Sequence, residues 1–169
     1  MRTIVRLIDS ISEYTGKVVR WACVALVGVL VYEVIMRYAF SAPTIWSYEL
    51  SSMLGVTIVI LGAAYTHRHH GHVRVDVFYT RFPPKWKTII DIVFALLLFF
   101  PLLITLTYAA ASGMRHSWAA GEVLIGTIWY PPAGPIRTVM FLGLFLLALQ
   151  GVAQFIRDLY LLIRNKPYD

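Results

Sequence analysis

The chain has 169 residues, of which 59% are hydrophobic and 14% are charged, and its formal net charge at pH 7 is +6. A mean hydropathy of +0.68 is typical of an integral membrane protein and leaves no room for a separate soluble domain. We therefore predict one membrane domain over residues 1–169. Nucleic acid is not an expected partner, because the basic residues are explained by their position relative to the membrane.

The first 17 residues are not a secretory signal, because Asp9 and Glu13 interrupt what would have to be a basic and then an apolar region. Apolar side chains recur in this segment at helical spacing, at Ile4, Leu7, Ile8, Ile11, Tyr14 and Val18. This pattern predicts a short amphipathic helix that lies along the cytoplasmic interface before the chain enters the membrane. A second interpretation, that the segment extends the first membrane helix, stays open.

Four apolar stretches follow, and a helix needs about 20 such residues to cross about 30 Å of hydrocarbon. We predict an all-α fold with four transmembrane helices at about 18–40, 44–66, 88–114 and 136–160. In the third helix, Pro101 removes one backbone hydrogen bond. A membrane helix either tolerates this loss or kinks at the proline. In the second, the small residues Ser51, Gly55 and Gly62 could allow close contact with another helix.

The basic residues and the tryptophans predict how the helices are oriented. Of the 15 Lys and Arg residues, twelve lie before the first helix, between the second and third, or after the fourth. The positive-inside rule therefore places both termini and the middle loop in the cytoplasm. Indole rings prefer the headgroup region of phospholipid. Four tryptophans near predicted helix ends are therefore candidate interfacial anchors: Trp21, Trp86, Trp118 and Trp129.

A group of polar residues lies near the outer ends of the first two helices. Glu33 and Arg37 are four residues apart and share one helical face, so their pairing would reduce the cost of placing charge in the membrane. Glu49 could join them across the short turn through Pro43, and Trp46 is included in the same predicted polar group. This face either meets another protein or a water-filled path, or it is an internal pair of the helix packing.

The middle loop carries four histidines within six residues: His67, His69, His70 and His72. Imidazoles this close together can bind a transition metal. However, no cysteine lies near them and Asp76 is the only nearby carboxylate, so the loop does not show the ligand spacing of a usual metal site. We expect a solvated basic loop that faces the lipid headgroups, and we predict no metal, cofactor or catalytic site anywhere in the chain.

Several short runs, in their order and spacing, resemble the small membrane subunit of tripartite ATP-independent periplasmic (TRAP) transporters over roughly residues 18–160. The runs are Arg37-Tyr38-Ala39-Phe40, Trp46 with Glu49, His72-Val73-Arg74-Val75-Asp76, Phe82-Pro83, and Trp129 with Pro132 and Gly134. This sequence departs from the family pattern at Gly126-Thr127, at its doubled prolines and in its histidine-rich loop.

The resemblance implies an accessory role in secondary transport at the bacterial inner membrane. A periplasmic binding protein would capture an organic acid and pass it to a large membrane subunit driven by a sodium gradient. The small subunit would pack on the scaffold of the large one, with Arg37, Trp46 and Glu49 at positions that the family shares. Two other classes stay open: a small proton-coupled exporter that uses Glu33, and a membrane redox or cytochrome subunit.

Overall fold

The structure is a computed structural model, and it describes residues 2–69 and 83–164. Its helices are α1 (Arg2–Ala39), α2 (Ser47–Arg68), α4 (Pro84–Phe94), the π-helical turn η1 (Ala95–Phe99), α5 (Phe100–Ala120) and α6 (Gly134–Arg164). Four helical segments are long and apolar enough to cross a membrane, because α4, η1 and α5 form one of them, from Lys85 to Ala120. The described residues hold no strand, only an isolated bridge between Val123 and Pro132. The predicted all-α fold with four membrane helices is confirmed.

The N-terminal segment extends the first membrane helix, as the second interpretation proposed. The prediction of a separate interfacial helix was wrong. α1 runs without interruption for 38 residues, about 57 Å at 1.5 Å per residue. Of the predicted apolar face, Ile8 packs within the chain, whereas Leu7 and Tyr14 do not. Leu7 and Tyr14 are 61% and 71% exposed, whereas Val5 and Ile8 are buried in a small core with Ala153 of α6.

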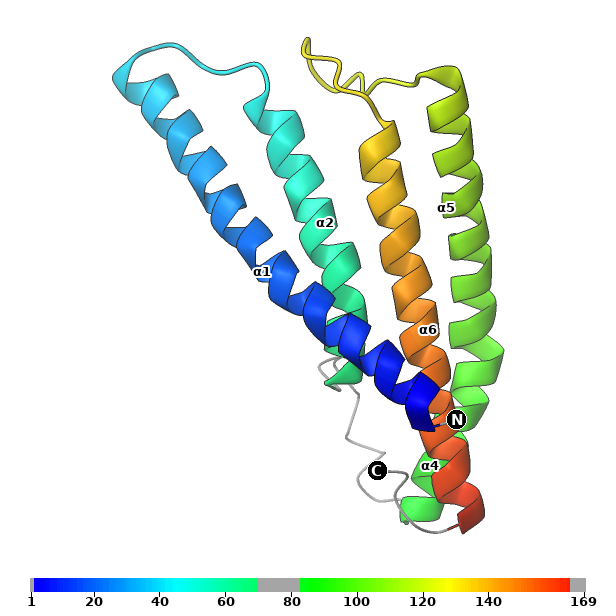
Figure 1. The fold of residues 1–169 in the computed structure, drawn as a ribbon. Coiled ribbons are helices and arrows are strands. Elements are labelled where there is room, and N and C mark those ends of the chain that lie inside the picture. The colour runs from blue at the N-terminus through cyan, green and yellow to red at the C-terminus, as the bar shows by residue number, and fades with distance from the viewer. Residues whose placement is uncertain (1, 70–82, 165–169) are drawn as a thin grey trace.

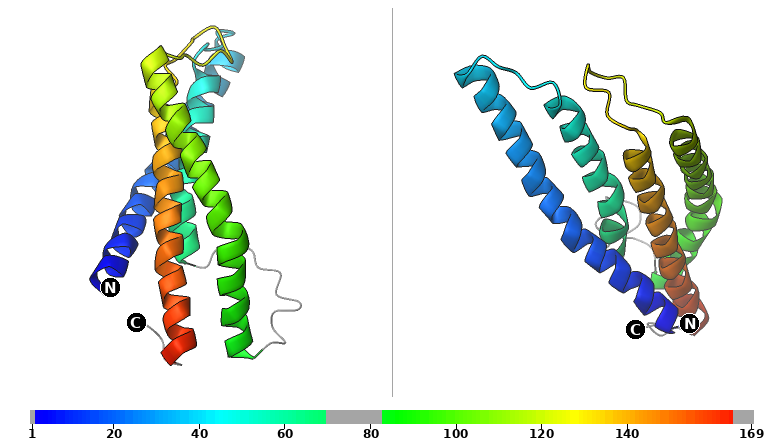
Figure 2. Two further views of the ribbon diagram at one scale, coloured as in Figure 1. Left: turned by 90° about the vertical axis from the view of Figure 1, so that its right-hand side faces the viewer. Right: turned by 45° about the horizontal axis from the view of Figure 1, so that its top comes forward.

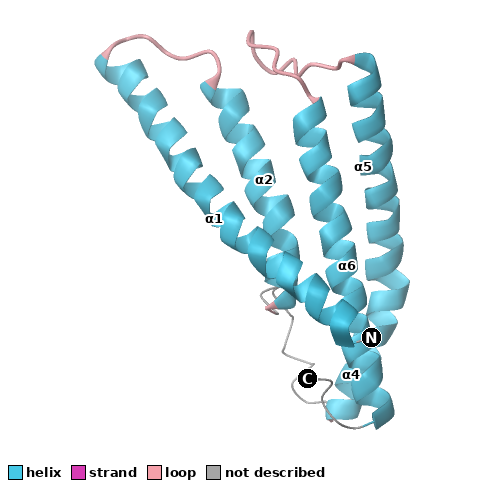
Figure 3. Cartoon of the chain, viewed as in Figure 1, coloured by secondary structure: helices cyan, strands magenta, loops and turns pink. Residues whose placement is uncertain are grey.

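The four long helices stand side by side in one layer, in the order α1, α2, α6, α5 (Figure 1). α1 begins and α6 ends at one end of the layer, which we call the terminal end. The turn after α1 and the loop after α5 lie at the other, which we call the loop end (Figure 3). The layer is twisted. α1 approaches α6 at the terminal end and diverges from it toward the loop end (Figure 1), whereas in the perpendicular view the helices cross near the loop end and spread toward the terminal end (Figure 2, left).

Glycines set the closest contacts between helices, but they are not the predicted ones. A Cβ atom added to Gly143 of α6 would lie 2.1 Å from Ile60 Cγ2 and 2.8 Å from its carbonyl carbon. Gly16 of α1 packs equally closely on the ring of Tyr65 in α2. By contrast, no atom of the described residues lies within 4 Å of a Cβ built on Gly55 or Gly62, so these two residues make no close contact within the described chain, and contact with a helix of another protein stays a prediction.

The third membrane helix responds to Pro101 with a local change of hydrogen bonding. Directly before the proline, η1 forms a π-helical turn in which the N–H of Phe100 donates to the carbonyl of Ala95. Donor and acceptor in this turn are five positions apart in the sequence instead of the four of an α-helix, which is a recognised way to accommodate irregularity inside a long helix.

Candidate polar sites at the two ends of the helix layer

At the loop end, Glu33 ties α1 to the turn that follows it. Its Oε1 accepts hydrogen bonds from Arg37 Nη2 at 2.6 Å and Nε at 3.1 Å. Its Oε2 accepts from the backbone N–H of Thr44 at 3.0 Å and also from the Thr44 hydroxyl. Both carboxylate oxygens therefore have donors from within the chain. Glu33 is 8% exposed, so a buried carboxylate is matched by a guanidinium and a backbone amide, as burial of charge requires.

The other two residues of the predicted polar group lie apart from this pair. Trp46 stacks on Tyr32, with ring centroids 5.7 Å apart. Glu49 in the first turn of α2 is only 5% exposed, and its Oε1 has no hydrogen-bond partner among the described residues. It lines a cavity of about 410 Å³ together with Arg137. The polar group therefore divides into a satisfied pair and an unsatisfied carboxylate in a separate cavity.

A second hairpin, formed by α5, α6 and the loop between them, carries its own ion pair. Arg137 in the first turns of α6 donates through Nη2 to Glu122 Oε1. The loop itself is closed by two backbone hydrogen bonds, from Leu124 N to the Pro131 carbonyl and from Ala133 N to the Glu122 carbonyl, each 2.8 Å. Sequence reasoning missed this pair, because 15 residues of chain separate its members.

The terminal end holds a buried polar network that sequence reasoning also missed. Gln150 of α6 is fully buried, and its Nε2 donates to Asp9 Oδ1 at 3.0 Å. Its Oε1 accepts from the Ser12 hydroxyl at 2.8 Å. Asp9 also forms an ion pair with Arg157 of α6, and its backbone carbonyl accepts from Arg68 of α2 at 2.8 Å. Through its carboxylate and its backbone carbonyl, Asp9 of α1 thus contacts both α6 and α2. The available signal was Gln150 itself, one of two amide side chains in an otherwise apolar stretch.

Glu13 extends the network one turn along α1. Its Oε2 lies 2.9 Å from Arg68 Nη1 and 3.2 Å from His69 Nε2, and its Oε1 lies 3.4 Å from Lys17 Nζ. Glu13 of α1 thus binds the C-terminal end of α2 through Arg68 and His69. The first 17 residues are therefore part of the helix packing.

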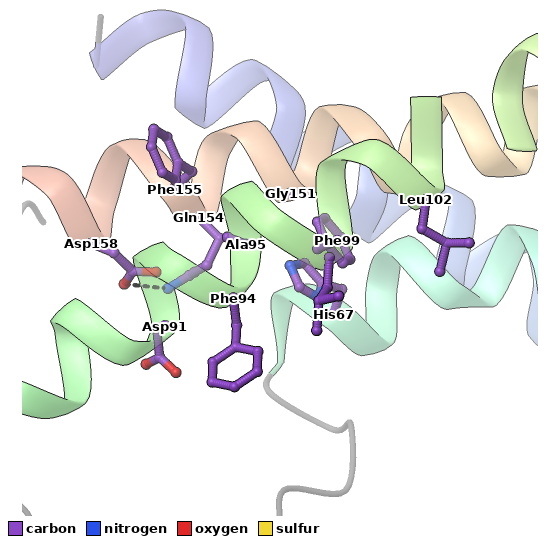
Figure 4. Close-up of a pocket in the computed structure, with 11 residues that line it drawn as sticks. His67, Asp91, Phe94, Ala95, Phe99, Leu102, Gly151, Gln154, Phe155 and Asp158 are labelled. Atoms are coloured by element: carbon purple, nitrogen blue, oxygen red, sulfur yellow. Dashed lines mark hydrogen bonds between the residues drawn. The ribbon is translucent and has the colours of Figure 1, made fainter. Parts of the chain in front are cut away.

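The two described histidines of the predicted cluster, His67 and His69, have different partners. The ring of His67 stacks on Phe99, with centroids 5.1 Å apart, while His69 contacts Glu13. His70 and His72 lie outside the described residues. His67 and Phe99 line a second cavity of about 410 Å³ with Phe94, Asp91 and Asp158 (Figure 4). Within residues 2–69 and 83–164, no three potential metal ligands gather in one place.

The four candidate anchors are all exposed, by 65%, 57%, 63% and 40% for Trp21, Trp86, Trp118 and Trp129. Trp118 has a second role, because its Nε1 donates to the Thr138 hydroxyl at 2.9 Å and so joins α5 to α6. Exposure of an indole ring is compatible with a place in the headgroup region. The anchoring role itself stays a prediction.

Two comparisons with known proteins bear on these sites. Residues 26–160 match the family model described as "Tripartite ATP-independent periplasmic transporters, DctQ component". The sialic acid TRAP transporter permease protein SiaT of Haemophilus influenzae is 30% identical over 91 residues, which are 52% of this chain and 15% of that protein. The sialic acid TRAP transporter small permease protein SiaQ of Vibrio cholerae is 24% identical over 117 residues, 62% of this chain and 68% of that one.

Proposed function

We propose that this chain, which belongs to the family of DctQ components of TRAP transporters, is the small accessory subunit that extends the scaffold of a larger transport protein. Membership makes it a multi-pass component of the inner membrane and a part of a transport system, not an enzyme. Within that system, we propose which protein this chain packs against and which class of substrate the assembly transports.

The observation that carries the proposal is the single layer of helices. In a closed four-helix bundle each helix buries one side against its neighbours, whereas here only 6% to 22% of the residues in the apolar part of each membrane helix are buried. The exposed fraction is 59% for Val27, 68% for Val59, 69% for Leu97 and 46% for Leu142. Such a layer can place one face against a second membrane protein and the other against lipid.

The relative SiaT supports a large membrane subunit as the partner. The part of SiaT that matches this chain is 15% of a protein named as a permease. A sequence similar to this chain therefore exists within one polypeptide together with a much longer permease segment. Segments joined in one protein often correspond to separate chains that assemble, and we propose that assembly for this chain.

The substrate class, the coupling ion and the binding protein are further parts of the proposal. Both relatives are named for sialic acid, which is a sugar that carries a carboxylate. We propose an organic acid as the transported substrate, a periplasmic protein that delivers it, and a sodium gradient as the driving force. None of these would bind to the sites described above, which hold helices together.

The arrangement at Glu33 argues against the small exporter. A carboxylate that cycles protons must exchange between charged and neutral forms, yet Glu33 accepts hydrogen bonds from Arg37 and Thr44 on both oxygens. Those donors favour the ionised form. Hydrogen bonds on both oxygens of Glu33 are expected of a carboxylate with a structural role.

The proposal is tested by affinity purification of the tagged chain from membranes that also contain the neighbouring permease subunit, followed by uptake of a radiolabelled organic acid. We expect the permease to co-purify and uptake to be lost when this chain is deleted. Equal uptake by the permease alone would contradict the accessory role. Deletion strains complemented with the wild-type chain provide the control for expression.

A further inference from the structure

The cavity that holds Glu49 lies between α2 and α6 at the loop end, and its composition is unusual for a gap between membrane helices. Two charged side chains of opposite sign line it, Glu49 from α2 and Arg137 from α6. Apolar side chains that include Met53, Val56 and Met140 line it as well. Its volume of about 410 Å³ lies within the range of small-molecule sites in proteins.

Glu49 lacks the donor that a buried carboxylate needs. The residue is 5% exposed, and its Oε1 is buried without a hydrogen-bond partner in the described part of the chain. The neighbouring loop makes room for this oxygen with a glycine, because a Cβ at Gly126 would lie 2.4 Å from it. An unpaired buried charge is strongly unfavourable. A hydrogen-bond donor on another molecule would satisfy this oxygen.

Arg137 supplies the opposite charge at the same cavity. Its Nη2 donates to Glu122 Oε1, but a guanidinium carries five N–H groups in a fork that suits phosphate as well as carboxylate. The side chain is 37% exposed. It can therefore keep its bond to Glu122 and still contact a second anion.

We propose that this cavity binds phosphatidylethanolamine. The primary ammonium donates to Glu49 Oε1, the phosphate lies on Arg137, and the first part of an acyl chain runs along Met53, Val56 and Met140. A basic side chain from a protein partner would satisfy Glu49 but would place no anion on Arg137 and nothing along the apolar wall. Phosphatidylcholine has no N–H or O–H donor in its headgroup, and phosphatidylglycerol has hydroxyl donors but no positive charge, so phosphatidylethanolamine is the one of the three that offers Glu49 both a donor and a cation.

The proposal predicts a headgroup preference that needs no mutation to measure. The full chain, purified from membranes with its accompanying subunits and delipidated in detergent, is titrated with phosphatidylethanolamine or phosphatidylcholine of identical acyl chains. Native mass spectrometry counts the bound lipid. We expect about tenfold tighter binding of phosphatidylethanolamine, the effect of one hydrogen bond to a charged group. Equal binding of the two lipids would overturn the proposal.

Cross-linking with a carbodiimide tests whether the lipid amine lies beside Glu49, since this reagent joins a carboxylate to a neighbouring primary amine. We expect a phosphatidylethanolamine adduct on the peptide that contains Glu49, and its loss in Glu49→Gln, which keeps the shape of the side chain. The control Glu13→Gln removes a carboxylate at the terminal end and should retain the adduct. If Glu49 is joined instead to a lysine of another subunit, a protein occupies the cavity and the proposal is wrong.

Discussion

The closest approach between α2 and α6 predicts a large effect of adding one methyl group. In Gly143→Ala the new Cβ would lie 2.1 Å from Ile60 Cγ2 and 2.8 Å from the Ile60 carbonyl carbon and oxygen. The side-chain atom can move by rotation, but the backbone atoms cannot. The helices must therefore separate by roughly half an ångström or more to restore van der Waals contact. We expect a loss of about 1–3 kcal/mol in the free energy of unfolding, as for overpacked cores.

Gly55→Ala provides the matched control, because the same change on α2 meets no described atom within 4 Å. It should leave stability unchanged or raise it slightly, since alanine has the higher helix propensity. Unfolding of both variants is followed by circular dichroism during titration of mixed micelles with sodium dodecyl sulfate. If Gly143→Ala is as stable as Gly55→Ala, the close contact between α2 and α6 does not exist and the order of helices in the layer must be revised.

Two further predictions concern the polar sites. Gln150→Leu should lower the free energy of unfolding by about 1–3 kcal/mol, because it leaves Asp9 without an amide donor. The control Gln154→Leu loses a hydrogen bond to Asp158 within α6. In the same titration it should lower the free energy of unfolding by less than half as much. Glu33→Ala should reduce retention of the large subunit during purification more than Lys85→Ala does, because it releases the turn at Thr44; equal retention would show that this turn does not contribute to the assembly.

The four membrane helices were predictable because the bilayer imposes their length and continuity. Each helix must satisfy its own backbone hydrogen bonds and cross a fixed thickness of hydrocarbon, so long apolar stretches have few alternatives. The pairing of Glu33 with Arg37 was also predictable, since a spacing of four residues places both on one face of a helix. These inferences depend on local geometry alone.

The packing faces were not predictable, because hydrophobicity does not separate inside from outside in a membrane. In α1 the exposed positions include Leu7 and Tyr14, while the buried ones include Asp9 and Ser12. Lipid accepts apolar side chains as readily as a protein neighbour does, whereas polar side chains need partners from other helices. The partners of Asp9 lie 141 and 148 positions further along the chain, at Gln150 and Arg157. No local pattern can indicate a contact at that separation.

The distribution of polar contacts explains why α1 diverges from α6 toward the loop end. At the loop end, Glu33 joins α1 to its own turn, and Arg137 with Glu122 closes the α5–α6 hairpin; each bond lies within one hairpin. At the terminal end, Asp9 connects α1 to α6 and α2, so it joins the two hairpins. Between the hairpins at the loop end lies the cavity with Glu49. Whatever donates to Glu49 therefore bridges the two hairpins where the chain itself does not, and it would fix the angle between them. Loss of that donor should loosen the loop end and leave the terminal end intact, which hydrogen exchange measured at both ends of α2 would detect.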